Sequence, residues 1–143
     1  PYTTLFRSRI TQGYPYLVQL VGYLAWEAQP TGPISLDAVE AVREEAIGRL
    51  GTQVHQPSLR DVPPRQREYL DAMAHIEAQT GRSEISAKDL AVALDKPSTS
   101  LSDTRGKLIE RDLILPAGWG EVTFAQPYLG DYLRNQNKPR RIS

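Results

Sequence analysis

The sequence predicts a mostly α fold, in which a helical hairpin is followed by a winged helix-turn-helix domain with a small β-hairpin wing. Three observations predict it. Apolar residues recur at helical spacing in segments that proline- and glycine-rich stretches separate. Towards the C-terminus, two short helical segments flank a tight turn. Two short strand-like segments around a glycine-rich turn come next, before a last amphipathic helix.

The first eight residues, Pro1-Tyr2-Thr3-Thr4-Leu5-Phe6-Arg7-Ser8, resemble the translation of a widely used short-read sequencing adapter. We therefore interpret them as an artefact and exclude them from the fold. The alternative is a short N-terminal strand or arm built on Tyr2, Leu5 and Phe6. On the first interpretation the chain is a fragment whose native N-terminus is missing.

Residues 9–51 are expected to form a hairpin of two helices. Pro15 suits the first turn of a helix, where its missing N–H is not needed. Apolar residues then recur at helical spacing to about residue 29, and the prolines and glycine of residues 30–33 end the pattern. Ser35 is expected to cap a second helix and Gly51 to end it. The buried stripe of this helix is predicted at Leu36, Val39, Ala46, Ile47 and Leu50.

Residues 52–63 are predicted to be a linker, because they hold prolines and little periodic hydrophobicity. The winged-helix domain is expected over residues 64–134, and residues 135–143 form a polar tail. The first helix of the domain is predicted from about Pro64 to Gln79, with Gly81 just beyond its end.

The helix-turn-helix begins at Ser86, which together with Asp89 has the spacing of a capping box. Residues 95–98 break this helix and start the next, which extends to about residue 112. Residues 113–125 then predict a β-hairpin with its turn at residues 117–120, because apolar and polar residues alternate after the turn.

Composition narrows the possible chemistry. The 143 residues include 17 Lys and Arg against 17 Asp and Glu, and no cysteine. Without cysteine, disulfides, thiol catalysis and thiolate metal sites are excluded. His55 and His75 have no partner at a zinc-ligand spacing, so we expect both at the surface or core edge and no metal. The longest apolar stretch, residues 14–26, is too short to cross a bilayer, and we expect a soluble, cytoplasmic chain.

Two motifs carry a resemblance to a known family. The first is Thr11-Gln12-Gly13-Tyr14-Pro15-Tyr16-Leu17-Val18-Gln19-Leu20, and the second is the helix-turn-helix and hairpin of residues 85–125 followed by Gln126-Pro127-Tyr128-Leu129. Over residues 9–134 the chain resembles the C-terminal portion of bacterial AAA+/STAND-type ATPases, similar in layout to the Orc/Cdc6-like group. In these proteins a helical lid is followed by a winged helix.

This resemblance implies that Gly13, Tyr14 and Pro15 contact nucleotide, with the proline near the adenine. ATP or ADP with Mg²⁺ would then be cofactors of the full-length parent only, whose ATPase core would lie upstream of residue 9. The chain departs from such a core because it has no Gly-x-x-x-x-Gly-Lys-[Ser/Thr] loop and no strand that ends in paired acids. We therefore expect no enzymatic activity from this chain.

If the winged helix binds DNA, its second short helix enters the major groove. The candidate contacts are Ser100, Ser102, Arg105 and Lys107, with Trp119 at the hairpin tip. Residues 82–143 hold ten Lys and Arg against eight Asp and Glu, which weakly favours an anionic partner.

Other observations favour a different partner. Asp103, Glu110 and Asp112 lie on the same helix and would oppose phosphates, and Trp119 has the alternative of packing against its own domain. The alternative that the winged helix of the ATPase binds a protein partner therefore remains. So do a free-standing winged-helix transcription regulator that binds DNA and a pure protein-interaction module.

Overall fold

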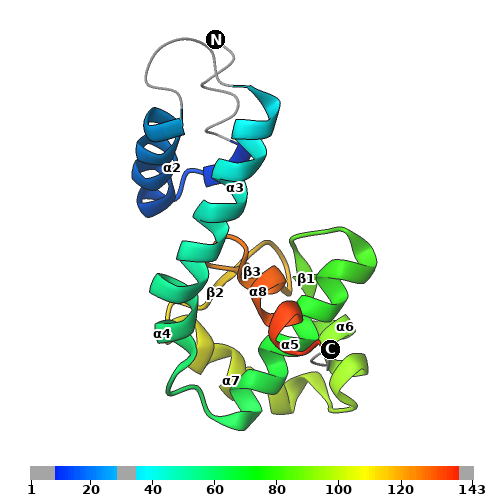
Figure 1. The fold of residues 1–143 in the computed structure, drawn as a ribbon. Coiled ribbons are helices and arrows are strands. Elements are labelled where there is room, and N and C mark those ends of the chain that lie inside the picture. The colour runs from blue at the N-terminus through cyan, green and yellow to red at the C-terminus, as the bar shows by residue number, and fades with distance from the viewer. Residues whose placement is uncertain (1–8, 29–34, 139–143) are drawn as a thin grey trace. The chain divides into compact units, whose positions relative to one another are not determined.

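A computed structural model describes residues 9–28 and 35–138 of the chain. Figure 1 shows a mostly helical protein with one small antiparallel sheet, so the coarse fold class is confirmed. The chain divides into two compact units, Pro1–Pro57 and Ser58–Ser143. The expectations for residues 1–8, for the helix-ending residues 30–33 and for the end of the polar tail at 139–143 lie outside the described residues.

Two consecutive helices dominate the N-terminal unit, α2 (Pro15–Ala28) and α3 (Leu36–Leu50). Ser35 caps α3 as predicted, because its hydroxyl oxygen accepts the Ala38 N–H at 3.2 Å. The two helices pack through a shared apolar core. Its members are Ile10, Leu17, Val21, Leu24, Val42, Ala46 and Leu50.

Leu36 does not belong to this core, although the spacing predicted that it would. Its side chain is 74% exposed. The buried residues of α3 are Val42, Ala46 and Leu50, which recur every four residues along one face. Leu36 lies in the first turn and to one side of that face.

The segment predicted as a linker, residues 52–63, is largely helical. A π-helix, η1 (Gly51–His55), follows α3 directly, and α4 (Gln56–Leu59) follows η1. Gly51 has right-handed helical angles, φ −58° and ψ −46°, so it does not end α3 in the left-handed cap that we expected. Gly51 and His55 of the N-terminal unit are buried, and Leu59 of the C-terminal unit belongs to the core of that unit. His55 is therefore inside, whereas His75 is exposed.

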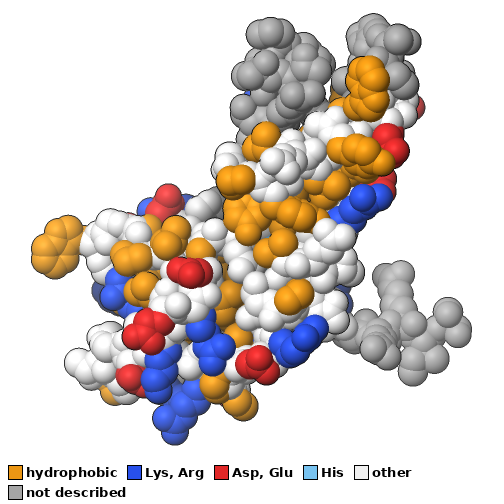
Figure 2. Space-filling model, turned by 90° about the vertical axis from the view of Figure 1, so that its left-hand side faces the viewer, with side chains coloured by type: hydrophobic (Ala, Val, Ile, Leu, Met, Phe, Trp, Pro, Cys, Tyr) orange, Lys and Arg blue, Asp and Glu red, His pale blue; other side chains and the backbone are white. Residues whose placement is uncertain are grey.

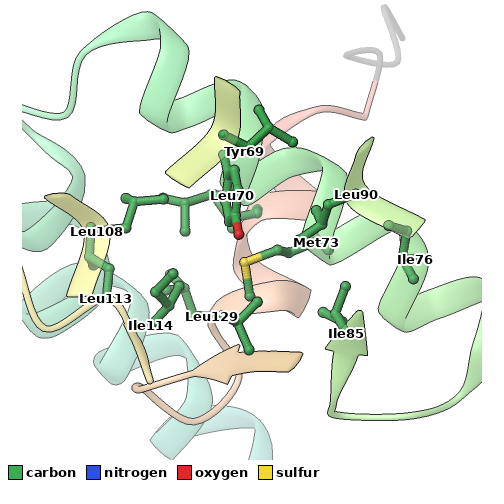
Figure 3. Packing of buried hydrophobic residues seen from close by; sticks show 14 of the residues in the cluster. Tyr69, Leu70, Met73, Ile76, Ile85, Leu90, Leu108, Leu113, Ile114 and Leu129 are labelled. Carbon is green, nitrogen blue, oxygen red and sulfur yellow. The ribbon is translucent and has the colours of Figure 1, made fainter. Parts of the chain in front are cut away.

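The C-terminal unit is organised around the long helix α5 (Pro64–Thr80). The remaining elements are β1 (Ile85–Ser86), α6 (Ala87–Leu94), α7 (Ser98–Glu110), β2 (Ile114–Pro116), β3 (Glu121–Phe124) and α8 (Leu129–Gln136). Figure 3 shows Tyr69, Leu70 and Met73 of α5 at the centre of the core, with Leu108, Ile114 and Leu129 from other elements around them. Helix α5 ends at Gly81, whose φ of 69° makes the left-handed cap predicted there.

The sheet has the strand order β1-β3-β2, and both pairs are antiparallel. Ile85 pairs with Val122, and Ile114 pairs with Phe124. The hairpin of β2 and β3 was predicted, but β1 was not. A strand of two residues has no alternation that a sequence pattern can reveal, and only its pairing with β3 defines it.

A close contact between α5 and α8 joins the two ends of this unit. Arg134 of α8 donates to the Ala74 carbonyl oxygen at 2.6 Å and forms an ion pair with Glu77 at 3.0 Å. Burial raises the pKa of the Glu77 carboxyl, and the Arg134 hydrogen bond and charge only partly offset this. Burial alone would lower the pKa of Arg134, but its hydrogen bonds to Glu77 and Asp131 outweigh that effect and raise it.

Gly130 is required where α8 approaches Glu77. A Cβ at this position would overlap Oε1 of Glu77 and lie 3.1 Å from Cε2 of Phe124. We expect Gly130→Ala to lower the free energy of unfolding by about 1–3 kcal/mol through overpacking, measured by urea denaturation. Gly106→Ala on α7 is the matched control, because its Cβ meets nothing within 4 Å and alanine should stabilise the helix by about 0.5–1 kcal/mol. Equal stabilities for the two variants would contradict the packing at Gly130.

The raised pKa of Glu77 predicts how stability depends on pH. Because the folded-state pKa lies above the ordinary value of 4.5, the folded protein binds this proton more tightly than the unfolded chain. The stability gained from this tighter proton binding is fully present below pH 4.5 and is lost as pH rises through the folded-state pKa of Glu77. Glu77→Gln mimics the protonated carboxyl at every pH, so the unfolding free energy of the wild type relative to this variant should increase as pH falls from 7 towards 4.5. A difference between the two proteins that does not change with pH would refute the assignment.

Candidate interaction surface

Helices α6 and α7 are joined by the short turn Asp95–Pro97. Ser86 caps α6 by accepting the Asp89 N–H at 3.0 Å, which is the backbone half of the predicted capping box. Asp95 ends α6 in the left-handed conformation, with φ 53°. Pro97 precedes α7 with extended angles, so the chain turns sharply and α7 begins at once.

The structure does not bring all the predicted contact residues of α7 to one face. Ser100 and Ser102 are both exposed, but two residues apart on a helix they point to nearly opposite sides. The Ser100 hydroxyl also donates to the Pro97 carbonyl oxygen at 2.8 Å, as part of the first turn of α7. Lys107 is exposed.

Arg105 is only half-exposed and lies near α5. Burial raises the pKa of the Tyr69 hydroxyl on α5, and the positive charge of Arg105 lowers the same pKa by a smaller amount. Arg105 is also less exposed than its helix neighbours Gly106 and Lys107.

The outward face of α7 carries both signs of charge. Leu101 and Leu108 are buried, which places Asp103 and Glu110 on the opposite, exposed side. The Lys107 ammonium pairs with Asp103 at 3.0 Å. Figure 2 shows Lys and Arg side chains interspersed with Asp and Glu on one face of the molecule, with no separate basic region on that face.

Trp119 stands at the tip of the β2–β3 hairpin and is 101% exposed. It does not pack against its own domain, which was the alternative that the sequence left open. The turn that holds it is tight, because the Ala117 N–H donates to the Glu121 carbonyl oxygen at 2.8 Å. Gly118 and Gly120 flank the tryptophan with φ of 67° and 61°, a conformation that favours glycine.

The sequence did not single out a second feature, an open hollow at the α6–α7 turn. It has a volume of about 430 Å³, and its lining residues are Ala91, Val92, Asp95, Lys96 and Pro97. Val92 is 77% exposed. In the sequence, Val92 is an apolar residue that lies off the buried face of α6, which is marked by Leu90. That position was the only sequence signal of the hollow.

The predicted nucleotide contacts lie in the N-terminal unit, in the turn before α2. Gln12 and Gly13 are both left-handed, with φ of 50° and 75°, and the Tyr14 N–H donates to the Thr11 carbonyl oxygen at 2.9 Å. Gly13 and Pro15 are exposed and Tyr14 is half-buried. The three candidates are therefore neighbours on one tight turn whose surface is open to solvent.

Residues 9–28 and 35–138 contain no group of three or more His, Cys, Asp or Glu side chains that could hold a metal ion. No helix in this part of the chain combines the length and apolar character needed to cross a membrane.

The fold and this surface define a small helical domain with a three-stranded sheet, an exposed helix and an exposed hairpin tip. Residues 52–133, more than half of the chain, match a family model described as a domain of unknown function (DUF8462). The chain belongs to this family. Comparisons with curated proteins and with solved structures gave no match.

Proposed function

We propose that residues 58–138 form a winged helix whose α7 and β2–β3 hairpin dock on a partner protein. The order α5, β1, α6, α7, β2, β3 supports the winged helix, together with a sheet in which β3 lies between β1 and β2. In this arrangement α6, the turn at Asp95–Pro97 and α7 form the helix-turn-helix, and residues 117–120 form the tip of the wing.

The charge on α7 is the observation that favours a protein over DNA. Acidic side chains on a docking face repel phosphates and weaken DNA binding. Here Asp103 and Glu110 lie on the exposed side of α7, and Lys107 is already paired with Asp103. The exposed apolar side chains also favour a protein partner. Val92 is 77%, Leu115 46% and Trp119 101% exposed. Aromatic residues such as Trp119 are enriched in protein interfaces.

DNA-binding assays test this proposal directly. We expect a labelled mixed-sequence duplex to bind the chain no more tightly than about 10⁻⁶ M at physiological salt, measured by fluorescence anisotropy. Lys107→Ala on α7 and Arg60→Ala outside it should then behave alike. A dissociation constant near 10⁻⁸ M would instead establish the DNA-binding regulator, provided that Lys107→Ala weakens the binding. The same variant should then reduce the slope of the binding constant against salt concentration, on logarithmic scales, by about one.

We further propose that the chain is the C-terminal regulatory region of an AAA+/STAND-type ATPase, with the N-terminal unit as its lid. The turn geometry supports this role for Gly13, Tyr14 and Pro15. Two consecutive left-handed residues hold the chain in one sharp bend, and Pro15 fixes the start of α2 behind it. Such a bend leaves Gly13 and Pro15 exposed, with Tyr14 half-buried between them, on a turn of fixed shape that could close over a nucleotide base. The nucleotide itself would be held chiefly by the ATPase core.

The lid proposal is tested in a protein that joins this region to its ATPase core. Pro15→Ala should weaken ATP binding several-fold, because the loss of the fixed φ lets the turn depart from the closed geometry. Isothermal titration with ATP measures the change, and Pro116→Ala in β2 serves as the control. Equal ATP affinity in the Pro15 variant and the parent would refute the lid and favour a free-standing regulator.

A further inference from the structure

A second pocket lies where α5, α6 and α7 meet, and it is more enclosed than the hollow at the α6–α7 turn. Its volume is about 250 Å³. Its apolar lining consists of Leu101, which is buried, and Leu94, which is half-buried. The three helices pack against one another within the C-terminal unit, so the fold itself sets the shape of this pocket.

Two cations line this pocket without an acidic partner. Arg65 lies in the first turn of α5, and Lys96 lies in the turn before α7. Neither takes part in an ion pair among the described residues, although Glu68 lines the same pocket. The lining therefore holds two positive charges against one negative charge, and this balance favours an anionic ligand.

The helix ends around the pocket add to its positive potential. Both α5 and α7 begin without a side-chain cap, and neither has Asp or Glu in its first turn. Because the start of a helix carries a partial positive charge, an acidic or capping side chain is favoured there. Arg65 stands in the first turn of α5 instead, where the helix dipole disfavours a cation. An anion in the pocket would stabilise both cations and both helix ends at once.

The remaining polar groups of the lining are the Glu68 carboxylate and the hydroxyls of Ser100 and Thr104. The Ser100 hydroxyl donates to the Pro97 carbonyl oxygen at 2.8 Å, so its oxygen is left to accept from a ligand. A carboxylate also only accepts. Bare phosphate offers these acceptors little, because most of its oxygens are acceptors too. A phosphate joined to a carbon skeleton that carries hydroxyl groups offers them donors.

We propose that this pocket binds a small phosphate monoester that carries hydroxyl groups, which is the chemical class of a sugar phosphate. Arg65 and Lys96 bind the phosphate, and Glu68 accepts hydrogen bonds from the ligand hydroxyls. Leu94 and Leu101 pack against the carbon atoms of the ligand. The inference rests on neither the partner protein nor the ATPase proposed above.

The experiment titrates the isotope-labelled full chain with ribose 5-phosphate, followed by nuclear magnetic resonance and by isothermal titration calorimetry. We expect a dissociation constant between about 10 μM and 1 mM, as for other ligands of this size. The largest changes in amide chemical shift should fall in residues 65–68 and 94–104. Inorganic phosphate should shift the same amides but bind at least about tenfold more weakly, and ribose alone should not bind.

Substitutions of the two cations then assign the phosphate contacts. Arg65→Gln and Lys96→Gln should each weaken ribose 5-phosphate binding at least about fivefold. Both side chains are exposed, so circular dichroism should show an unchanged fold. Arg60→Gln and Lys88→Gln are the matched controls, because these exposed cations do not line the pocket, and they should leave the affinity unchanged.

The Glu68→Gln variant tests the hydroxyl contacts separately. Loss of the negative charge should strengthen the binding of inorganic phosphate, whereas ribose 5-phosphate also loses a strong acceptor for its hydroxyls. The ratio of the two affinities should therefore fall at least about threefold.

Four results would overturn the proposal. The first is the absence of shift changes up to about 10 mM ribose 5-phosphate. The second is equal affinity for inorganic phosphate, and the third is equal weakening by the control variants, which would indicate diffuse attraction to surface charge. The fourth is a DNA duplex that shifts the same amides and that ribose 5-phosphate does not displace. A pocket that binds neither probe leaves the duplex assay of the proposed function unaffected, so the two proposals fail separately.

Discussion

Burial of one face of α5 is the constraint on which the C-terminal unit depends. This helix contributes Tyr69, Leu70, Met73, Ala74 and Ile76 to the core. It contacts α6, α7, α8 and β1, so four elements of the unit pack against it. A fully buried side chain of this size stabilises a fold by about 1.5–3 kcal/mol relative to exposure. Leu108 of α7 and Ile114 of β2 belong to the same core cluster, so α7 and the β2–β3 hairpin pack into the core to which α5 contributes.

The same packing determines which side chains remain exposed to solvent and can contact a partner. Once Leu101 and Leu108 are turned inward, α7 presents Asp103, Glu110 and Lys107 to solvent. Arg105 is only half-exposed, and its charge partly offsets the rise that burial causes in the pKa of Tyr69. The hairpin buries Val122 and leaves Trp119 outside. A surface with paired charges and exposed apolar groups results, and this combination is the basis of the proposed protein interface.

Elements whose signals are local could be predicted from the sequence. Ser35 and Ser86 cap their helices, and Gly81 ends α5, because a side-chain hydroxyl or a missing Cβ acts within a few residues. Features that depend on distant partners were missed. Strand β1 exists only through its pairing with β3, and the helices at residues 51–59 have no periodic apolar pattern in the sequence that could have predicted them.

The candidate site shows the same division. That α7 and the hairpin tip are exposed follows from the order of elements, whereas the half-burial of Arg105 and the full exposure of Trp119 depend on packing. The most direct test of the account is a nuclear magnetic resonance experiment on the intact chain, which reports the β1–β3 pairing and solvent access to Trp119 together. The account predicts cross-strand contacts between Ile85 and Val122 and, at low concentration, strong broadening of the Trp119 indole N–H by a soluble paramagnetic agent. Absence of the cross-strand contacts, or a shielded indole in the monomer, would contradict it.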